Sequence, residues 1–291
     1  MMVATRRVGT RDELDEAMTS AVTTAELGPL VPLAANSPNQ WIAVNGMILR
    51  ARIGSEVQGM STGGSDIDEM GICLEPHETV IGHRRFEHYT WRTQPDGVVS
   101  GPGDLDLTVY SLRKFVHLVT AGNPTVLMML FLPDEHILYR TPIADELFAR
   151  RDLFLSRQAG PKFRGYLESQ RRGLLGLRSG GSRNHGRQDI RDRYGFDVKF
   201  AAHMVRLGIQ GVELLSTGRI TLPIPEPDRS WLVELRRGEH TKQEALDRAE
   251  RLEARIDALL TEGRSPLPEH PDHAAIDGWM ADVHRRFWGW A

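Results

Sequence analysis

One stretch of the sequence, residues 52–72, limits what the chain can fold into more than any other. An apolar run ends abruptly at Gly54-Ser55, a glycine-rich loop follows, and Asp66-Ile67-Asp68 then opens a second apolar run. In a strand alternate side chains share a face, so Asp66 and Asp68 point the same way, with Cα atoms roughly 7 Å apart. Such a pair can share hard divalent cations, and a glycine-bounded turn beside it can direct backbone N–H groups at a phosphate. The stretch therefore predicts a nucleotide-and-metal site.

A second segment with strand periodicity, residues 104–110, carries further carboxylates. One face of this expected strand is apolar and the other is polar: Leu105, Leu107 and Val109 against Asp104, Asp106, Thr108 and Tyr110. Together with Asp66 and Asp68, Asp106 could hold two Mg²⁺ ions close together, and Asp104 is the alternative third carboxylate. Two such ions clamp the attacking and departing oxygens of an in-line phosphoryl transfer.

The order of the expected elements divides the chain into three parts. Residues 1–35 are expected to form an N-terminal helix, opened by the capping-box pattern Thr10–Glu13, and a linker. Residues 36–150 alternate strands and helices, which argues for an α/β or α+β domain with a mixed sheet. Residues 151–291 show helical spacing without convincing strand alternation, so they are expected to form a C-terminal helical domain.

Capping residues and turns predict several boundaries inside these parts. The run Trp41–Ile53 is expected to end as a strand, and residues 75–103 are expected to be largely irregular. Ser111, Asn123 and Thr241 have the side chains and the context of helix N-caps. Further helices are predicted over 125–132, 153–177, 196–215 and around 276–287, with a loop at 179–186.

The composition excludes several protein classes. With 40% hydrophobic and 26% charged residues, the 291-residue chain has the composition of a soluble globular protein. No run approaches the ~18 apolar residues of a membrane helix, and the N-terminus lacks the apolar core of a secretory signal. The single cysteine, Cys73, excludes an internal disulfide framework and a cysteine-built zinc site. We therefore expect a cytoplasmic protein that does not enter a membrane.

The formal net charge of −3 hides an asymmetry along the chain. Residues 151–206 contain 13 Lys and Arg against 5 Asp and Glu, a net charge of +8, so the rest of the chain sums to −11. A basic block beside an acidic body is what a polyanion-binding surface requires. The alternative is a set of solvated helix faces.

Three segments resemble a known family. They are GSEVQGMSTGGSDIDEMGI, DLTVYSLRKFVHLVTAGNPTVLMMLF and YGFDVKFAAHMVRLGIQGVELLSTGRITLP. All three resemble the RlaP-type or YcgL-like family (RNA repair pathway, ligase-associated) of the DNA polymerase β-like nucleotidyltransferase superfamily, over roughly residues 40 to 290. The resemblance implies a polymerase-β-like palm followed by a helical domain, Mg²⁺ dependence, NTP as substrate, and RNA repair in company with RNA ligases.

The resemblance also assigns roles to individual residues. It implies that Asp66, Asp68 and Asp106 are the catalytic metal ligands. It further implies phosphate contacts at Gly54 and Ser55. The sequence offers as further candidate nucleotide contacts Ser65, Tyr110, Lys114, Lys199, His203 and Arg206. The last three fall at i, i+4 and i+7, so they share one helix face, where they could neutralise a triphosphate or fix the base. Packing or solvation is the alternative role for this helix face, and packing for Tyr110 and Lys114.

These observations predict a nucleotidyltransferase (EC 2.7.7 type) that adds a nucleotide to an RNA end, with tRNA or cleaved tRNA as the expected acceptor. One alternative keeps the chemistry and changes the acceptor to a protein or a small hydroxylated molecule. Another is a non-catalytic nucleotide-binding regulator. Three converging carboxylates argue against the regulator, because a site without catalysis has no use for them.

Overall fold

A five-stranded mixed sheet forms the centre of the first half of the protein. The computed structural model describes residues 37–61, 66–95, 98, 100–177 and 188–290. The strand order is β3-β4-β2-β1-β5, with β2 and β4 parallel and the other neighbours antiparallel. The strands are β1 (Met47–Arg52), β2 (Ile67–Cys73), β3 (His88–Arg92), β4 (Leu105–Ser111) and β5 (Ile137–Arg140).

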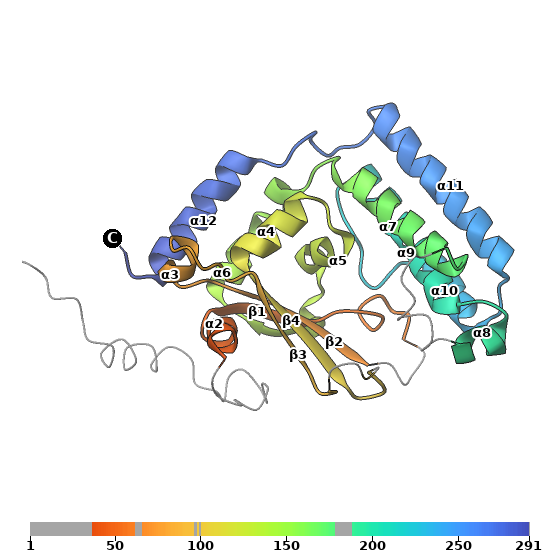
Figure 1. The fold of residues 1–291 in the computed structure, drawn as a ribbon. Coiled ribbons are helices and arrows are strands. Elements are labelled where there is room, and N and C mark those ends of the chain that lie inside the picture. The colour runs from red at the N-terminus through yellow and green to blue at the C-terminus, as the bar shows by residue number, and fades with distance from the viewer. Residues whose placement is uncertain (1–36, 62–65, 96–97, 99, 178–187, 291) are drawn as a thin grey trace, which may run out of the picture.

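Both faces of the sheet are covered by helices (Figure 1). On one face α2 (Pro38–Asn45) packs against the sheet, and Leu107 and Val109 of β4 join its apolar cluster. The predicted alternation of β4 is confirmed, because these two side chains are buried whereas Asp106 and Tyr110 of the other face are half-buried. The second face lies against the main core. The helices that follow the sheet strands are α3 (His77–Val80), α4 (Leu112–Thr120), α5 (Pro124–Leu127) and α6 (Pro142–Ala149).

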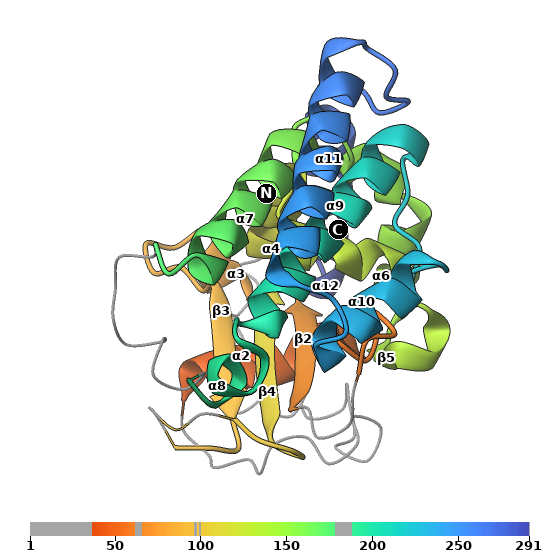
Figure 2. The same ribbon diagram turned by 90° about the vertical axis from the view of Figure 1, so that its right-hand side faces the viewer.

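The second half of the chain is helical, as predicted, and α9 lies at its centre. This 20-residue helix packs against α7, α10 and α11 (Figure 2). Most of the residues of α9 are buried, so few of its side chains are exposed. The helices are α7 (Ala159–Leu174), α8 (Gln188–Tyr194), α9 (Val198–Thr217), α10 (Asp228–Arg237), α11 (Lys242–Thr261) and α12 (His273–Phe287). Short 3₁₀ turns lie at Met128–Phe131, Asp134–His136 and Arg151–Phe154.

The predicted helix caps are confirmed. The Ser111 hydroxyl accepts a hydrogen bond from the backbone N–H of Lys114 at the start of α4. The Asn123 side chain accepts hydrogen bonds from the backbone N–H groups of Thr125 and Val126 at the start of α5. Thr241 and Glu244 form the reciprocal capping box at the start of α11. The helix expected over 125–132 begins one residue earlier, at Pro124, and tightens into a 3₁₀ turn at Met128.

Other expectations differ from the structure or lie beyond it. The prediction that residues 75–103 are largely irregular is wrong in part, because they contain α3 and β3. β5, α6, α8 and α10 were not predicted. The expected N-terminal helix and the loop at 179–186 lie outside the described residues.

The C-terminal helix α12 returns to the sheet half of the molecule (Figure 1). Trp279 of this helix donates to Glu146 of α6, and Trp288 donates to the backbone carbonyl of Glu75 after β2. One buried core runs from Ile48 to Val283 across the expected boundary at residue 150, and that boundary stays a prediction. No described helix combines the length and apolarity needed to cross a membrane.

Candidate active site

Three carboxylates meet where β2 and β4 begin. The parallel register places Asp68 directly beside Asp106, and Asp66 lies just ahead of β2. One ligand oxygen from each of the three side chains lies within 4.8 Å of the others. Asp66 is exposed, whereas Asp68 and Asp106 are half-buried. The three predicted metal ligands are therefore brought together, at a spacing at which they can share divalent cations.

The electrostatics of Asp68 favour a bound cation. Burial, followed by the charges of Asp66 and Asp106, raises the pKa of the Asp68 carboxyl from 3.8 to about 6. Desolvation and like charges both disfavour the ionised form of a carboxyl group. A divalent cation would reverse this effect, because it attracts all three negative charges.

Asp106 is held by two neighbouring side chains. Arg92, its cross-strand partner on β3, donates from Nε to Asp106 Oδ1 at 2.8 Å. The Ser100 hydroxyl lies 2.9 Å from Asp106 Oδ2, and Arg92 Nη2 donates to that hydroxyl at 2.6 Å. These contacts fix the orientation of the Asp106 carboxylate beside the other two aspartates.

Asp104, the alternative third carboxylate, makes hydrogen bonds within the turn before β4 instead. It accepts hydrogen bonds from the backbone N–H of Gly101 at 2.7 Å and from the side chains of Gln94 and Thr93. These bonds, led by that of Gly101, lower the pKa of the Asp104 carboxyl. Asp104 closes the turn before β4 and is not a member of the carboxylate cluster, so the geometry favours Asp106.

The Gly54-Ser55 turn lies directly against Asp68. The Ile53 N–H donates to the Asp68 carbonyl at 2.8 Å, which fixes the end of β1 beside the predicted metal ligands. Gly54 has a φ of +83°, and a Cβ at this position would lie 2.5 Å from Asp68 Oδ2. Only glycine satisfies both the backbone angle and the close approach. The residues after Gly54 form a turn, which is closed by a hydrogen bond of 2.8 Å from the Met60 N–H to the Ser55 carbonyl oxygen.

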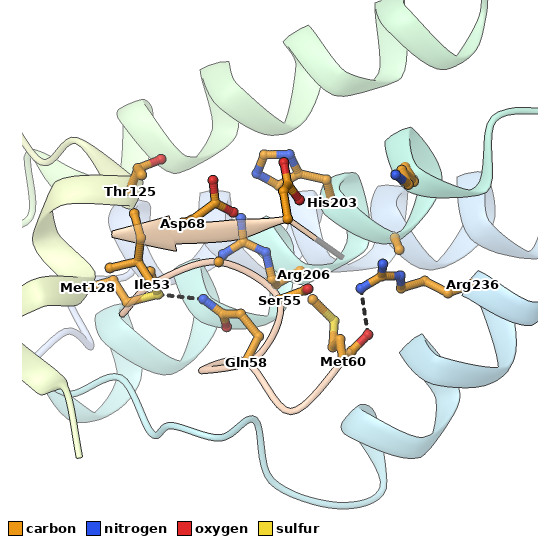
Figure 3. Close-up of a pocket in the computed structure, with 14 residues that line it drawn as sticks. Ile53, Ser55, Gln58, Met60, Asp68, Thr125, Met128, His203, Arg206 and Arg236 are labelled. Atoms are coloured by element: carbon orange, nitrogen blue, oxygen red, sulfur yellow. Dashed lines mark hydrogen bonds between the residues drawn. The ribbon is translucent and has the colours of Figure 1, made fainter. Parts of the chain in front are cut away.

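A pocket of about 390 Å³ opens beside these elements (Figure 3). Asp66 and Asp68 line it together with the Gly54-Ser55 turn. The predicted face of α9 contributes Lys199, His203 and Arg206, and α10 contributes Arg236. One cavity therefore brings two carboxylates together with a cationic wall, formed by the side chains of Lys199, Arg206 and Arg236. The other lining residues are Ile53, Gln58, Met60, Thr125, Met128 and Ala202.

Arg206 is oriented by a buried chain of amides. Arg206 Nη1 donates to Gln210 Oε1 at 2.7 Å, and Gln210 Nε2 donates to Gln58 Oε1 at 2.7 Å. The Gln58 amide in turn contacts the sulfur of Met128. Burial lowers the pKa of the Arg206 guanidinium to about 10, so the side chain keeps its charge at neutral pH. Burial also lowers the pKa of Arg236, which donates to the Met60 carbonyl.

Two predicted nucleotide contacts do not line this pocket. Lys114 pairs with Glu87 at 2.9 Å. Tyr110 is half-buried, packs against the main core and has its ring centroid 6.1 Å from that of His88. Ser65 lies outside the described residues.

Part of the basic block is neutralised within the fold. Arg164 pairs with Asp257 at 2.7 Å, and Arg171 pairs with Glu253 at 2.6 Å, both carboxylates being on α11. The charge excess of residues 151–206 therefore does not translate directly into a basic surface.

Sequence reasoning missed Arg236, Gln58 and Gln210. Arg236 is in the last turn of α10, where a basic side chain is usually explained by the helix dipole. Gln58 and Gln210 are 152 positions apart, and each glutamine alone resembles a surface residue. Only their burial, at 2% exposure each, reveals the connection.

Comparisons with known proteins identify the family of this chain. A stretch of 88 residues is 30% identical to an uncharacterized 38.9 kDa protein of the nrdC-mobD intergenic region of Enterobacteria phage T4, covering 30% of this chain and 26% of that protein. A solved nucleotidyltransferase-like protein from Exiguobacterium sibiricum aligns over 77% of this chain and 71% of its own, with 11% identity and a TM-score of 0.28. The family model of the RNA repair pathway DNA polymerase beta family, RlaP, matches residues 33–282. The chain therefore belongs to the RNA repair pathway DNA polymerase beta family.

Proposed function

We propose that the protein is a magnesium-dependent nucleotidyltransferase of the cytoplasm. It moves a nucleoside monophosphate from an NTP to an RNA end, with tRNA or cleaved tRNA as the acceptor. The observation that carries the proposal is the convergence of Asp66, Asp68 and Asp106 within 4.8 Å, beside a pocket with a cationic wall. An NTP bound with Mg²⁺ needs both, because the metal takes carboxylate ligands and the phosphates take cationic ones.

The carboxylate set fits Mg²⁺, which prefers a few carboxylates plus phosphate oxygens over a complete protein cage. Two bound ions would supply the clamp on the attacking and leaving oxygens. The chain's own residues do the rest. The Gly54-Ser55 turn binds the β and γ phosphates, Arg206 and Arg236 balance their charge, and Arg92 keeps Asp106 oriented.

The reaction replaces a phosphoanhydride bond of the NTP with a phosphodiester bond to the acceptor. The acceptor hydroxyl oxygen forms a bond to the α-phosphorus, and the bond from that phosphorus to the α,β-bridging oxygen breaks. Pyrophosphate leaves, and the hydroxyl proton passes to water. An RNA ligase that joins the extended end is the partner that we propose in the same pathway.

The test is label transfer. Purified protein, Mg²⁺ and total RNA are incubated with each α-³²P-labelled NTP in turn, and the products are separated by denaturing electrophoresis. We expect labelled RNA that disappears with EDTA and with the D68N variant. RNA that stays unlabelled while NTP is consumed into another product would refute the RNA acceptor.

One observation favours a second candidate. Because Arg164 and Arg171 are paired with carboxylates of α11, the basic surface available to RNA is smaller than the sequence indicates. The same site could then nucleotidylate a protein or a small-molecule hydroxyl. In that case binding to RNA would be weak and insensitive to salt, and the label would appear in protein or in a small product.

A further inference from the structure

A second, smaller cavity adjoins the carboxylate pocket. It has a volume of about 280 Å³ and is lined by residues of α8, the start of α9 and the end of α10. Lys199 and Arg236 line both cavities, so the two cavities are adjacent at these side chains. The remaining lining residues are Asp189, Ile190, Arg193, Tyr194 and Val198.

The chemistry of this cavity is that of an anion site. Arg193, Lys199 and Arg236 contribute three positive charges against the single carboxylate of Asp189. Arg193 is held with its guanidinium carbon 5.1 Å from the centre of the Tyr194 ring. Cation–π contact of this kind restrains an arginine without consuming its hydrogen-bond donors.

Tyr194 is held in turn by the end of α10. That helix ends at Gly238 with a φ of +80°, and a Cβ there would overlap the Tyr194 ring. Since the ring is already packed against Gly238 and Arg193, the cavity offers charge rather than an aromatic face for stacking. The first backbone N–H groups of α9 are capped by Asp197, so an anion must be bound by the side chains.

We propose that this cavity binds a backbone phosphate of the acceptor RNA, next to the end that reacts. The inference rests on the proposed function and adds the place where the acceptor is held. The phosphates of the NTP must lie within reach of the proposed metal ligands, of which Asp66 and Asp68 line the first cavity and none lines the second. A polynucleotide that ends at the carboxylates can place a phosphate on the far side of Lys199 and Arg236. Phosphate contacts of this kind position a nucleic acid without reading its sequence.

The test compares R193Q with R237Q. Arg237 is exposed, neighbours Arg236 and lines neither cavity, so R237Q is the matched control. A fluorescent single-stranded RNA of about 12 nucleotides is titrated by anisotropy at several salt concentrations. We expect R193Q to bind about fivefold more weakly and to reduce the salt slope by about 0.7, the value for one phosphate contact on a single strand. R193K should retain most of the affinity, and R237Q should match the wild type.

A second arm separates the two sources of phosphate. Calorimetric binding of a non-hydrolysable α,β-imido NTP with Mg²⁺ should be the same for R193Q and the wild type. Loss of analogue binding with unchanged RNA binding would assign the cavity to the NTP and overturn the inference. If the wild type labels RNA and R193Q binds RNA normally, only the inference fails. If the wild type consumes NTP without binding RNA, the RNA acceptor fails, and the inference fails with it.

Discussion

At the scale of single residues, Asp68 combines a raised carboxyl pKa with a place in the carboxylate cluster. Its pKa in the folded protein, about 6, lies above the 3.8 expected for the unfolded chain. The folded state therefore holds the Asp68 proton to higher pH. Stability falls as the pH rises from about 4 to about 6, and the full penalty is present at neutral pH.

We accordingly expect D68N to stabilise the metal-free protein at neutral pH while abolishing transfer. The full pKa shift would correspond to about 3 kcal/mol, but solvent screening of a half-buried group reduces this to about 1 kcal/mol. Thermal melts in EDTA at acidic and neutral pH would measure the gain, which should vanish below pH ~4. Adding Mg²⁺ should raise the melting temperature of the wild type and leave D68N unchanged. A D68N variant less stable than the wild type in neutral EDTA would mark Asp68 as a structural residue.

The assignment of the third carboxylate leads to a paired prediction. D106N removes a member of the cluster and should lower the transfer rate at least about a hundredfold, because several kcal/mol of charge stabilisation are lost. D104N alters only the turn before β4, so its rate should stay near that of the wild type. Initial rates of label transfer at saturating Mg²⁺ would measure both. The reverse order of effects would exchange the roles of Asp104 and Asp106.

At the scale of elements, the amide chain joins parts of the molecule that are remote in sequence. Gln58 belongs to the turn after β1, Gln210 to α9, and Met128 to the 3₁₀ turn after α5. Because Gln58 and Gln210 are buried, each must find its partner inside the protein. The chain thereby fixes where α9 presents Arg206 relative to the Gly54-Ser55 turn.

We expect Q210M, which keeps the side-chain length and removes the hydrogen bonds, to raise the KM for NTP about tenfold with a smaller change in kcat. Loss of about 1.4 kcal/mol from one charge-assisted hydrogen bond corresponds to this factor. Q170M is the control, because Gln170 is a buried glutamine of α7 that does not line the pocket. Steady-state kinetics would measure both variants. Equal increases of KM in Q170M and Q210M would show a general packing effect instead.

The same elements show what could be predicted from the sequence. β4 and α4 could be predicted because their alternation and capping residues are local signals. β3 could not, because it is an edge strand with half-exposed side chains that depends on pairing with β4. α10 was missed because its helical face is short, with only Leu232 and Leu235 buried.

In the candidate site, too, local sequence patterns could be predicted and tertiary contacts could not. The spacing of Asp66 and Asp68 is a local pattern, and so is the i, i+4, i+7 spacing of Lys199, His203 and Arg206. The preference for Asp106 over Asp104 depends instead on the parallel register of β2 and β4, which places Asp106 beside Asp68. The contacts made by Arg236 and Arg92 depend on tertiary packing, so they cannot be predicted from the neighbouring residues in the sequence.

At the scale of the whole molecule, α12 connects the end of the chain to the sheet half. Glu146 of α6 accepts hydrogen bonds from Trp279 and from Arg286. The hydrogen bonds from Arg286 are the largest cause of the lowered pKa of the Glu146 carboxyl. Nearby, His284 lies 3.2 Å from the buried Glu75. These contacts, and a core that runs from β1 to α12, predict that both halves unfold together.

Substitution of the buried Trp279 tests this coupling. W279A should cost about 3–5 kcal/mol, because it removes a large buried side chain. W290A is the control, since Trp290 is 46% exposed, and it should cost less than about 1 kcal/mol.

Guanidinium unfolding is followed by far-UV circular dichroism, which reports mainly on the helical half, and by tryptophan fluorescence. Both transitions should coincide and shift together in W279A. Mg²⁺, although its proposed site lies at the start of β2 and β4, should move both transitions to higher denaturant. Two separated transitions, of which Mg²⁺ moves only one, would instead support independent domains divided near residue 150.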